Sequence, residues 1–214
     1  LATCCGGRGE CLPQQSVDSG TLKLPRDTCG ADAVCMPSSL ADARAVPKTC
    51  ASVDGAEGRC LSTCLGKLTN LPDLPSAGCA RDEVCNPCYD PITGIATGAC
   101  TLHGDAPTQP AQRFERCCES GREVPAGVCV PPSMTRARTA DLFRRDSCAH
   151  DRICVPTAEL IDPGHQYPLC VGVGLGVCMP SCLFDPLDAL LLTSLTCDRG
   201  DSCVPCSPLI GGCN

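Results

Sequence analysis

Cysteine is the residue type in this sequence with the greatest capacity for chemistry. The chain of 214 residues contains 24 cysteines and only 3 histidines. Thiols at this density either bind metal ions or form disulfides, and zinc modules usually combine cysteine with histidine at fixed spacing. Because His103, His150 and His165 show no such spacing, we predict no metal site. We expect about twelve disulfides, formed in an oxidising compartment.

The cysteines fall into two sets of twelve with the same order of spacings. The first set is Cys4, Cys5, Cys11, Cys29, Cys35, Cys50, Cys60, Cys64, Cys79, Cys85, Cys88 and Cys100, and the second is Cys117, Cys118, Cys129, Cys148, Cys154, Cys170, Cys178, Cys182, Cys197, Cys203, Cys206 and Cys213. This duplication predicts a small disulfide-rich fold of two tandem homologous modules, residues 1–106 and 113–214, with a polar, proline-containing linker region at 103–112. We expect the pairing of cysteines to be the same in both modules and not to cross between them.

A shorter motif recurs inside each module, with two cysteines separated by five residues and a proline two places later. It appears as CGADAVCMP, CARDEVCNPC, CAHDRICVP and CDRGDSCVPC, and CGGRGECLP at residues 5–13 also fits. The motif predicts a small closed loop followed by a rigid, extended exit at the proline.

Regular structure is expected to be sparse, consisting of short helices and hairpins in a mostly irregular chain. The sequence has three Phe, two Tyr and no Trp, so the side chains that dominate most cores are scarce. Helix-start residues and terminating prolines predict short helices at residues 37–45, 156–161 and 185–195.

Two C-x-P-C motifs, Cys85–Cys88 and Cys203–Cys206, resemble the redox motif of thioredoxin-like proteins, in which a thiolate attacks disulfides. Neither lies on a strand-to-helix turn of an alternating α/β pattern, so we interpret both as structural cysteines. The sequence contains no G-x-S-x-G, H-E-x-x-H or phosphate-loop motif. We therefore predict no catalytic residue, no cofactor and no enzymatic activity.

The tripeptide Arg199, Gly200 and Asp201 lies between Cys197 and Cys203 and resembles the integrin-binding loops of disintegrin-like ligands. The equivalent loop of the first module contains Arg81-Asp82-Glu83 instead. We interpret the tripeptide mainly as part of a repeated loop, and keep it as a candidate adhesion site.

The two modules differ most in apolar content, which indicates a candidate assembly interface. Residues 51–59 of the first module are polar (ASVDGAEGR), whereas residues 171–177 are aliphatic and glycine-rich (VGVGLGV). The second module also has a leucine-rich segment at 183–196. The candidate interface residues are Val171, Val173, Leu175, Val177, Leu187, Leu190, Leu191, Leu192 and Leu195. They form either a local core or a surface that binds another protein.

Charge and hydropathy restrict the partners. The net charge of −7 disfavours nucleic acid, and the absence of an apolar run of 18 residues predicts no membrane span. We expect an extracellular structural protein that self-assembles head to tail into a filament or surface layer, with another surface protein as a possible partner. The alternative is a disulfide-rich binding module, such as a protease inhibitor or a receptor or adhesion ligand.

One segment resembles a known group of proteins. CNPCYDPITGIATGAC, Cys85–Cys100, is similar to a recurring segment of uncharacterised secreted cysteine-rich repeat proteins of Gram-negative bacteria. The resemblance implies secretion or a place on the cell surface. The ratio of 14 Arg to 3 Lys also favours a bacterial source.

Overall fold

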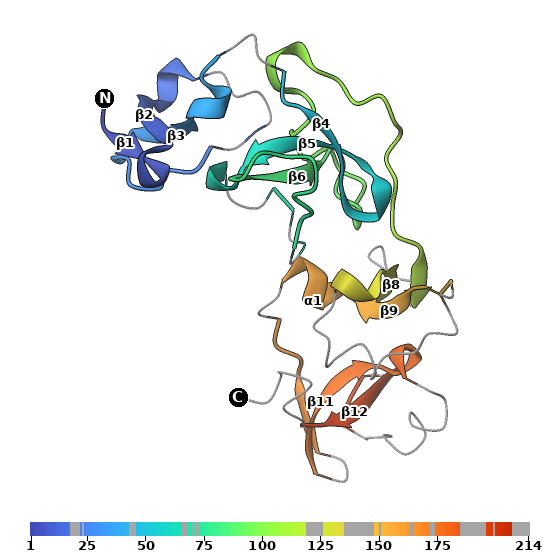
Figure 1. The fold of residues 1–214 in the computed structure, drawn as a ribbon. Helices are drawn as coiled ribbons and strands as arrows, with labels where there is room; N and C mark the ends of the chain where they lie inside the picture. The colour runs from blue at the N-terminus through green and yellow to red at the C-terminus, as the bar shows by residue number, and fades with distance from the viewer. Residues whose placement is uncertain are drawn as a thin grey trace. The chain divides into compact units, whose positions relative to one another are not determined.

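A computed structural model describes residues 1–17, 22, 24–42, 46–65, 68–69, 71, 73–118, 126–134, 148–149, 151–162, 165–171, 174–184, 196–198 and 200–206 (Figure 1). The chain divides into two compact units. The first comprises Leu1–Thr69 and Asp73–Arg113, and the second comprises residues 70–72 and the chain from Phe114 onward. The division falls next to the linker region expected from the sequence, and the two units are described separately below.

The described residues of the first unit form two antiparallel sheets of three strands each. The order of the first sheet is β1 (Thr3–Cys4), β2 (Gly9–Pro13) and β3 (Ala33–Pro37), and that of the second is β4 (Thr49–Ala51), β5 (Glu57–Ser62) and β6 (Glu83–Pro87). Six 3-10 turns connect or follow the strands: η1 (Cys5–Gly7), η2 (Gln14–Ser16), η3 (Ser38–Leu40), η4 (Val53–Gly55), η5 (Thr63–Leu65) and η6 (Leu102–Gly104).

The described part of the second unit also contains two three-stranded antiparallel sheets. They are formed by β7 (Arg116–Cys118), β8 (Gly127–Val130) and β9 (Ile153–Pro156), and by β10 (Leu169–Val171), β11 (Leu175–Pro180) and β12 (Asp201–Pro205). The helical elements here are η7 (Pro132–Met134), α1 (Thr157–Ile161) and η8 (Ser181–Leu183).

Sheets rather than helices therefore dominate, which corrects the expectation of a mostly irregular chain. The helix expected at 156–161 is present as α1. At 37–45 only the 3-10 turn η3 is found, and residues 43–45 lie outside the described residues. The helix expected at 185–195 lies outside them entirely.

The four sheets share one pattern of disulfides. In each sheet a disulfide joins the first strand to the third, and another joins the middle strand to the loop before the third strand. The pairs of the first kind are Cys4–Cys35, Cys50–Cys85, Cys117–Cys154 and Cys170–Cys203, and those of the second kind are Cys11–Cys29, Cys60–Cys79, Cys129–Cys148 and Cys178–Cys197. Their Cα–Cα distances of 5.4–5.9 Å are those of ordinary disulfides.

Three further disulfides complete the eleven that the described residues form. Cys5–Cys64 connects η1 to η5 in the first unit, Cys118–Cys182 connects β7 to η8 in the second, and Cys88–Cys100 closes a loop after β6. Cys206 is also disulfide-bonded. As expected, the pairing is the same at equivalent positions of both halves, and no described disulfide crosses between them.

This pairing corrects the interpretation of the C-x5-C motif as a closed loop. The two cysteines of each motif are bonded to other strands rather than to each other, and the second cysteine lies within the third strand. The proline that follows is the last residue of that strand, as in β3, β6, β9 and β12, where an edge position tolerates the missing N–H. Residues 5–13 fit the spacing but not this pairing, because Cys5 pairs with Cys64 and Cys11 with Cys29.

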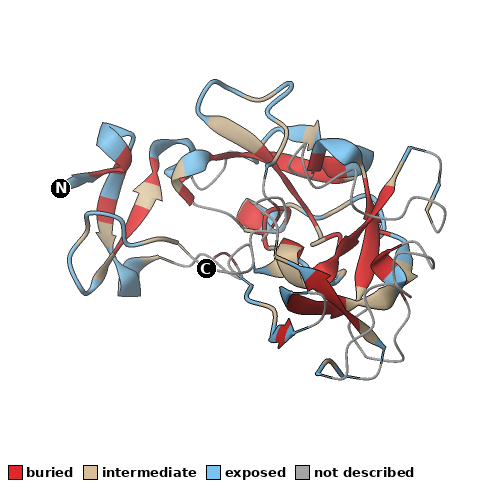
Figure 2. Cartoon of the chain, turned by 90° about the horizontal axis from the view of Figure 1, so that it is seen from below, coloured by how far each residue is buried: buried red, intermediate tan, exposed pale blue. Residues whose placement is uncertain are grey.

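Each unit also buries a group of apolar side chains, and Figure 2 marks the buried parts of the chain in red. In the first unit the core contains Leu22, Leu40, Leu61, Leu65 and Leu102, packed with the Cys88–Cys100 disulfide. In the second unit the buried residues include Val128, Val130, Ile153, Val155 and Met179. Burial of apolar side chains and covalent links therefore act together to stabilise each unit.

Candidate functional site

The two hairpins β4–β5 and β10–β11 occupy equivalent places in the disulfide pattern, and they differ in chemistry. In the first, Ala51 pairs with Glu57 and Thr49 with Arg59. In the second, Val171 pairs with Leu175 and Leu169 with Val177. A charged pair in the first unit is thus replaced by an aliphatic pair in the second, on the sheet face opposite the disulfide between the outer strands.

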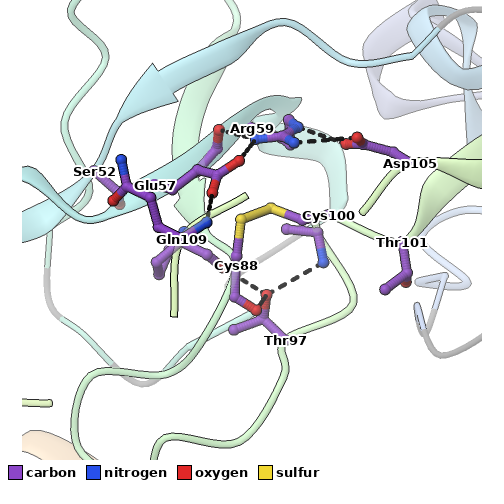
Figure 3. Close-up of a disulfide and its surroundings, with 12 residues drawn as sticks. Ser52, Glu57, Arg59, Cys88, Thr97, Cys100, Thr101, Asp105 and Gln109 are labelled. Atoms are coloured by element: carbon purple, nitrogen blue, oxygen red, sulfur yellow. Dashed lines mark hydrogen bonds and ion pairs between the residues drawn. A yellow bond between two sulfur atoms is a disulfide. The ribbon is translucent and has the colours of Figure 1, made fainter. Parts of the chain in front are cut away.

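Glu57, Arg59 and Asp105 form a buried ion cluster on the face of β5 (Figure 3). The Arg59 Nη1 to Glu57 Oε1 distance is 2.8 Å, and the side chains of both residues are only 4% exposed. Arg59 also donates two hydrogen bonds to the Asp105 carboxylate, from Nε at 2.5 Å and from Nη2 at 3.1 Å. A two-point contact of this kind fixes the carboxylate in direction as well as in distance.

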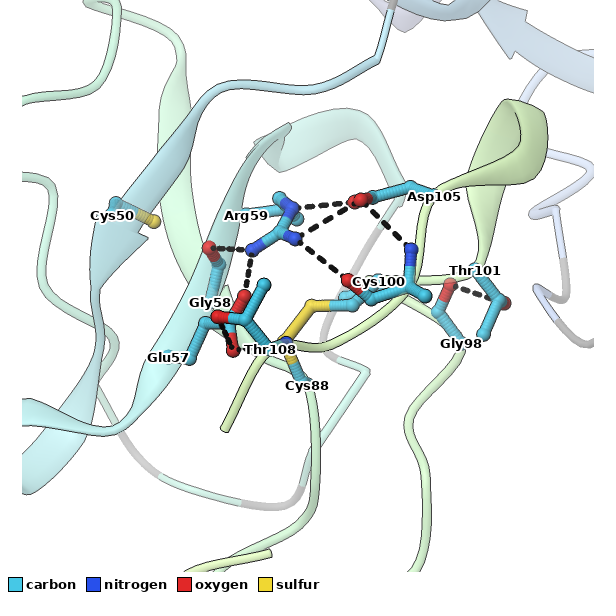
Figure 4. Close-up of polar contacts among 12 residues, drawn as sticks. Cys50, Glu57, Gly58, Arg59, Cys88, Gly98, Cys100, Thr101, Asp105 and Thr108 are labelled. Carbon is cyan, nitrogen blue, oxygen red and sulfur yellow. Dashed lines mark hydrogen bonds and ion pairs between the residues drawn. A yellow bond between two sulfur atoms is a disulfide. The ribbon is translucent and has the colours of Figure 1, made fainter. Parts of the chain in front are cut away.

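The remaining donors of Arg59 are also used. Nη1 donates to the carbonyl oxygen of Gly58 at 3.0 Å, and Nη2 donates to that of Ala106 at 3.4 Å (Figure 4). Buried charges are tolerated when they are paired and fully hydrogen-bonded. The cluster meets that condition, so Arg59 can remain charged inside the unit.

Glu57 uses its second oxygen, Oε2, to hold the segment 105–109. It accepts hydrogen bonds from the Thr108 N–H at 2.8 Å, the Thr108 hydroxyl at 3.0 Å and the Gln109 N–H at 2.7 Å. These residues belong to the region 103–112 that the sequence predicts to be a linker, but their hydrogen bonds attach them to the first unit. Hydrogen bonds to Glu57 and from Arg59 thus hold residues 105–109 against β5.

The cluster shifts the pKa of all three groups in the direction that keeps them charged. Burial works to raise the pKa of Glu57, but hydrogen bonds from Arg59, Gln109 and Thr108 together lower it from 4.5 to about 2. The hydrogen bond between Arg59 and Asp105 is the main cause that raises the pKa of Arg59 and lowers that of Asp105. Glu57, Arg59 and Asp105 are therefore all charged at neutral pH.

The loop closed by the Cys88–Cys100 disulfide lies next to this cluster (Figure 3). Asp90 Oδ1 accepts hydrogen bonds from the N–H groups of Ile92 and Thr93, both at 2.9 Å, which is an Asx turn. The Thr97 hydroxyl donates to the carbonyl oxygen of Pro87 at 2.6 Å. The loop leaves Ile95 68% exposed, and the side chains of Asp90 and Thr97 hydrogen-bond to backbone groups of the loop and of β6.

The candidate assembly residues divide into three groups. Val171 and Leu175 are 67% and 56% exposed, and Leu169, which the sequence did not single out, is 62% exposed. Val177 is fully buried and so cannot line a surface. Val173, Leu187, Leu190, Leu191, Leu192 and Leu195 lie outside the described residues.

No known protein family, curated protein or solved structure matches this chain. The helices among the described residues are too short or too polar to span a lipid bilayer. The fold and the site must therefore be interpreted from their own geometry.

The two cysteines that flank the tripeptide 199–201 are not bonded to each other. Cys197 is bonded to Cys178 and Cys203 to Cys170. Asp201 begins β12 and pairs with Pro180, Gly200 precedes it with a φ of 102°, and Arg199 lies outside the described residues. Asp201 is thus the first residue of a strand, and its N–H donates to the carbonyl oxygen of Asp198 at 3.0 Å, which closes a turn before it.

The cysteines of the C-x-P-C motifs are bonded to other partners. Cys85 pairs with Cys50, Cys88 with Cys100 and Cys203 with Cys170. Groups of three described cysteines do approach closely enough to suggest metal ligation, but every one of those sulfurs is already oxidised in a disulfide. Thiolates for redox chemistry or metal binding are therefore not present in these groups.

Sequence reasoning missed the ion cluster. Its only signal was the opposite charges of Glu57 and Arg59 two residues apart, which places both on one face of a strand. Asp105 lies far along the sequence, in a region interpreted as linker. Nothing in the composition indicates that this region folds back onto β5.

Proposed function

We propose that this chain is a non-catalytic extracellular structural protein that assembles head to tail into a filament or surface layer. The observation that carries the proposal is the use of one disulfide-closed sheet four times, with the exposed, apolar Leu175 of the second unit at the position of the buried, charged Glu57 of the first. Tandem parts with unlike faces favour a heterologous contact, which extends into a filament unless the rotation happens to close it.

The disulfides support the proposed extracellular location. Eleven of them in the described residues indicate folding in an oxidising environment, as outside the cytosol. Small sheets that are closed by disulfides at both edges resist unfolding and proteolysis because the unfolded chain has little freedom to gain. Such properties suit a protein that persists at a cell surface, which we infer to be bacterial.

Electron microscopy and light scattering of the oxidised protein test the proposal. We expect filaments or sheets, or a scattering mass that rises with concentration. A monodisperse monomer over the whole soluble range contradicts it.

A disulfide-rich binding module is the alternative function, and one observation favours it. The loop closed by the Cys88–Cys100 disulfide exposes Ile95, as protease inhibitors present a residue to an enzyme pocket. Nanomolar inhibition in a panel of serine and cysteine proteases, lost in Ile95→Glu, would support this function over assembly. A cell-adhesion assay with Asp201→Glu tests the tripeptide in the same way.

A further inference from the structure

Residues 101–116 connect the two units, and none of the described disulfides encloses them. The disulfide rings of the first unit together span residues 4–85 and 88–100, and those of the second span residues 117–203. The only other stretch outside these rings between residues 4 and 203 is 86–87, which is the buried end of β6. A single cut inside a ring leaves the pieces joined by a disulfide, whereas a single cut in residues 101–116 separates two disulfide-stabilised units.

The first part of this connector is attached to the first unit. The Glu57 carboxylate accepts hydrogen bonds from the N–H groups of Thr108 and Gln109, and Arg59 donates two hydrogen bonds to Asp105. A protease can therefore draw these residues into its active site only if the hydrogen bonds break first.

The next four residues, 110–113, are exposed, and the described backbone hydrogen bonds include none from their N–H or C=O groups. Free backbone groups allow an extended peptide to be bound as an added strand, which is how protease active sites hold their substrates. At the far end, the Arg113 side chain lies against Gly94, where a Cβ would collide with its guanidinium, and Phe114 is buried. The middle of the stretch is thus its most accessible part.

We propose that the peptide bond between Ala111 and Gln112 is a processing site, cleaved by a serine protease with a small, apolar S1 pocket of the elastase kind. Ala111 fits such a pocket, and Pro110 keeps the chain before it extended. Water is the second reactant. As the C–N bond breaks, the water oxygen goes to the Ala111 carbonyl carbon and both hydrogens go to the Gln112 nitrogen, which gives a carboxylate and an ammonium group.

The Glu57 carboxylate controls the rate of this cut. Gln109 precedes Ala111 by two residues, so its main-chain N–H is the group that the protease binds at its P3 subsite, and that N–H is already donated to Glu57. The segment must leave Glu57 before the protease can bind it fully. The second unit has Leu175 at the position of Glu57, so this control belongs to the unit that precedes the connector. The inference goes beyond the proposed assembly and does not depend on it.

The test digests the oxidised full chain with pancreatic elastase at neutral pH and follows the products on non-reducing gels and by mass spectrometry. We expect two separate fragments, residues 1–111 and 112–214. Glu57→Gln should produce them roughly 10–100-fold faster, because it weakens hydrogen bonds to a charged acceptor and cleavage follows the population of the released segment. Ala111→Asp should block the cut. Ala96→Asp, at an exposed alanine inside a disulfide ring, is the matched control and should not change it.

Asp105→Asn is a second release variant, which keeps Glu57, weakens the attachment to Arg59 and lies outside the residues that the protease contacts. It should also speed the cut. Circular dichroism and disulfide mapping verify that each variant is folded. The processing site is wrong if the first cut falls outside residues 110–113, if the fragments stay joined without reductant, or if neither the wild type nor a folded release variant is cut there. Equal rates for the wild type and both folded release variants would overturn the control by Glu57.

Discussion

Gly58 on β5 lies directly opposite Pro87 on β6, beneath the disulfide that joins the outer strands of the sheet. A Cβ on Gly58 would lie 2.5 Å from the carbonyl oxygen of Asn86 and 2.9 Å from the Sγ of Cys85. The same pairing occurs between Gly9 and Pro37, Gly127 and Pro156, and Gly176 and Pro205. Glycine on the middle strand is thus what allows the disulfide to pass across the sheet.

Substitution of this glycine should destabilise the sheet. We expect Gly58→Ala to lower the free energy of unfolding by about 1–3 kcal/mol, the usual effect of overpacking, because the atoms that its Cβ meets are backbone and a disulfide rather than a flexible side chain. Thermal unfolding of the oxidised protein measures the effect. Gly30→Ala is the control, since a Cβ there meets nothing within 4 Å, and an equal effect of the two variants contradicts the interpretation.

The disulfide pattern gives a prediction that peptide mapping can test. Digestion under non-reducing conditions at low pH, followed by mass spectrometry, should recover the eleven pairs, with Cys178 linked to Cys197 and Cys170 to Cys203. By equivalence with Cys88–Cys100, we expect Cys206 to be linked to Cys213, which lies outside the described residues. A peptide with Cys197 bonded to Cys203 would contradict the pattern and restore the closed loop around the tripeptide.

The number and spacing of the cysteines were enough to predict a disulfide-rich protein whose two halves have their cysteines in the same order. They did not predict the pairing, since the many connectivities of twelve cysteines share the same spacings. The recurring Gly-x-Cys of the middle strands, as in Gly58–Cys60 and Gly176–Cys178, is visible in the sequence. The reason for the glycine is not visible there, because it depends on which two cysteines form the disulfide that crosses over the middle strand. Likewise, the partner of Arg59 is set by how residues 105–109 fold back, which no local pattern encodes.

Acid should release the 105–109 segment from β5. Because the pKa of Glu57 is lower in the folded state than its ordinary value of 4.5, its contribution to stability is fully present above that value and is lost as the pH falls toward about 2. The lowered pKa of Asp105 acts in the same direction. Hydrogen exchange, corrected for the intrinsic rate at each pH, should show Thr108 and Gln109 losing protection across this range.

The matched control for acid release is Glu57→Gln. It removes the titrating carboxylate of Glu57, so the Thr108 and Gln109 amides should be less protected than in the wild type at neutral pH, and any loss of protection that remains as the pH falls is the contribution of Asp105. Protection of these amides that persists in the wild type at pH 2 would show that Glu57 does not hold the segment.

Replacing the ion pair with the residues of the second unit should cost less than breaking it. Arg59→Ala leaves Glu57 and Asp105 buried without a cation, and loss of one partner of a buried pair costs about 3–5 kcal/mol. The double variant Glu57→Leu, Arg59→Val installs the side chains found at Leu175 and Val177 and leaves Asp105 as the one carboxylate of the cluster without a cation. We expect the double variant to be more stable than Arg59→Ala in denaturant unfolding. The Thr108 and Gln109 amides should nevertheless lose protection from hydrogen exchange, because the carboxylate that accepts their hydrogen bonds is gone. If the double variant is the less stable of the two, the cluster stabilises the unit beyond holding the segment.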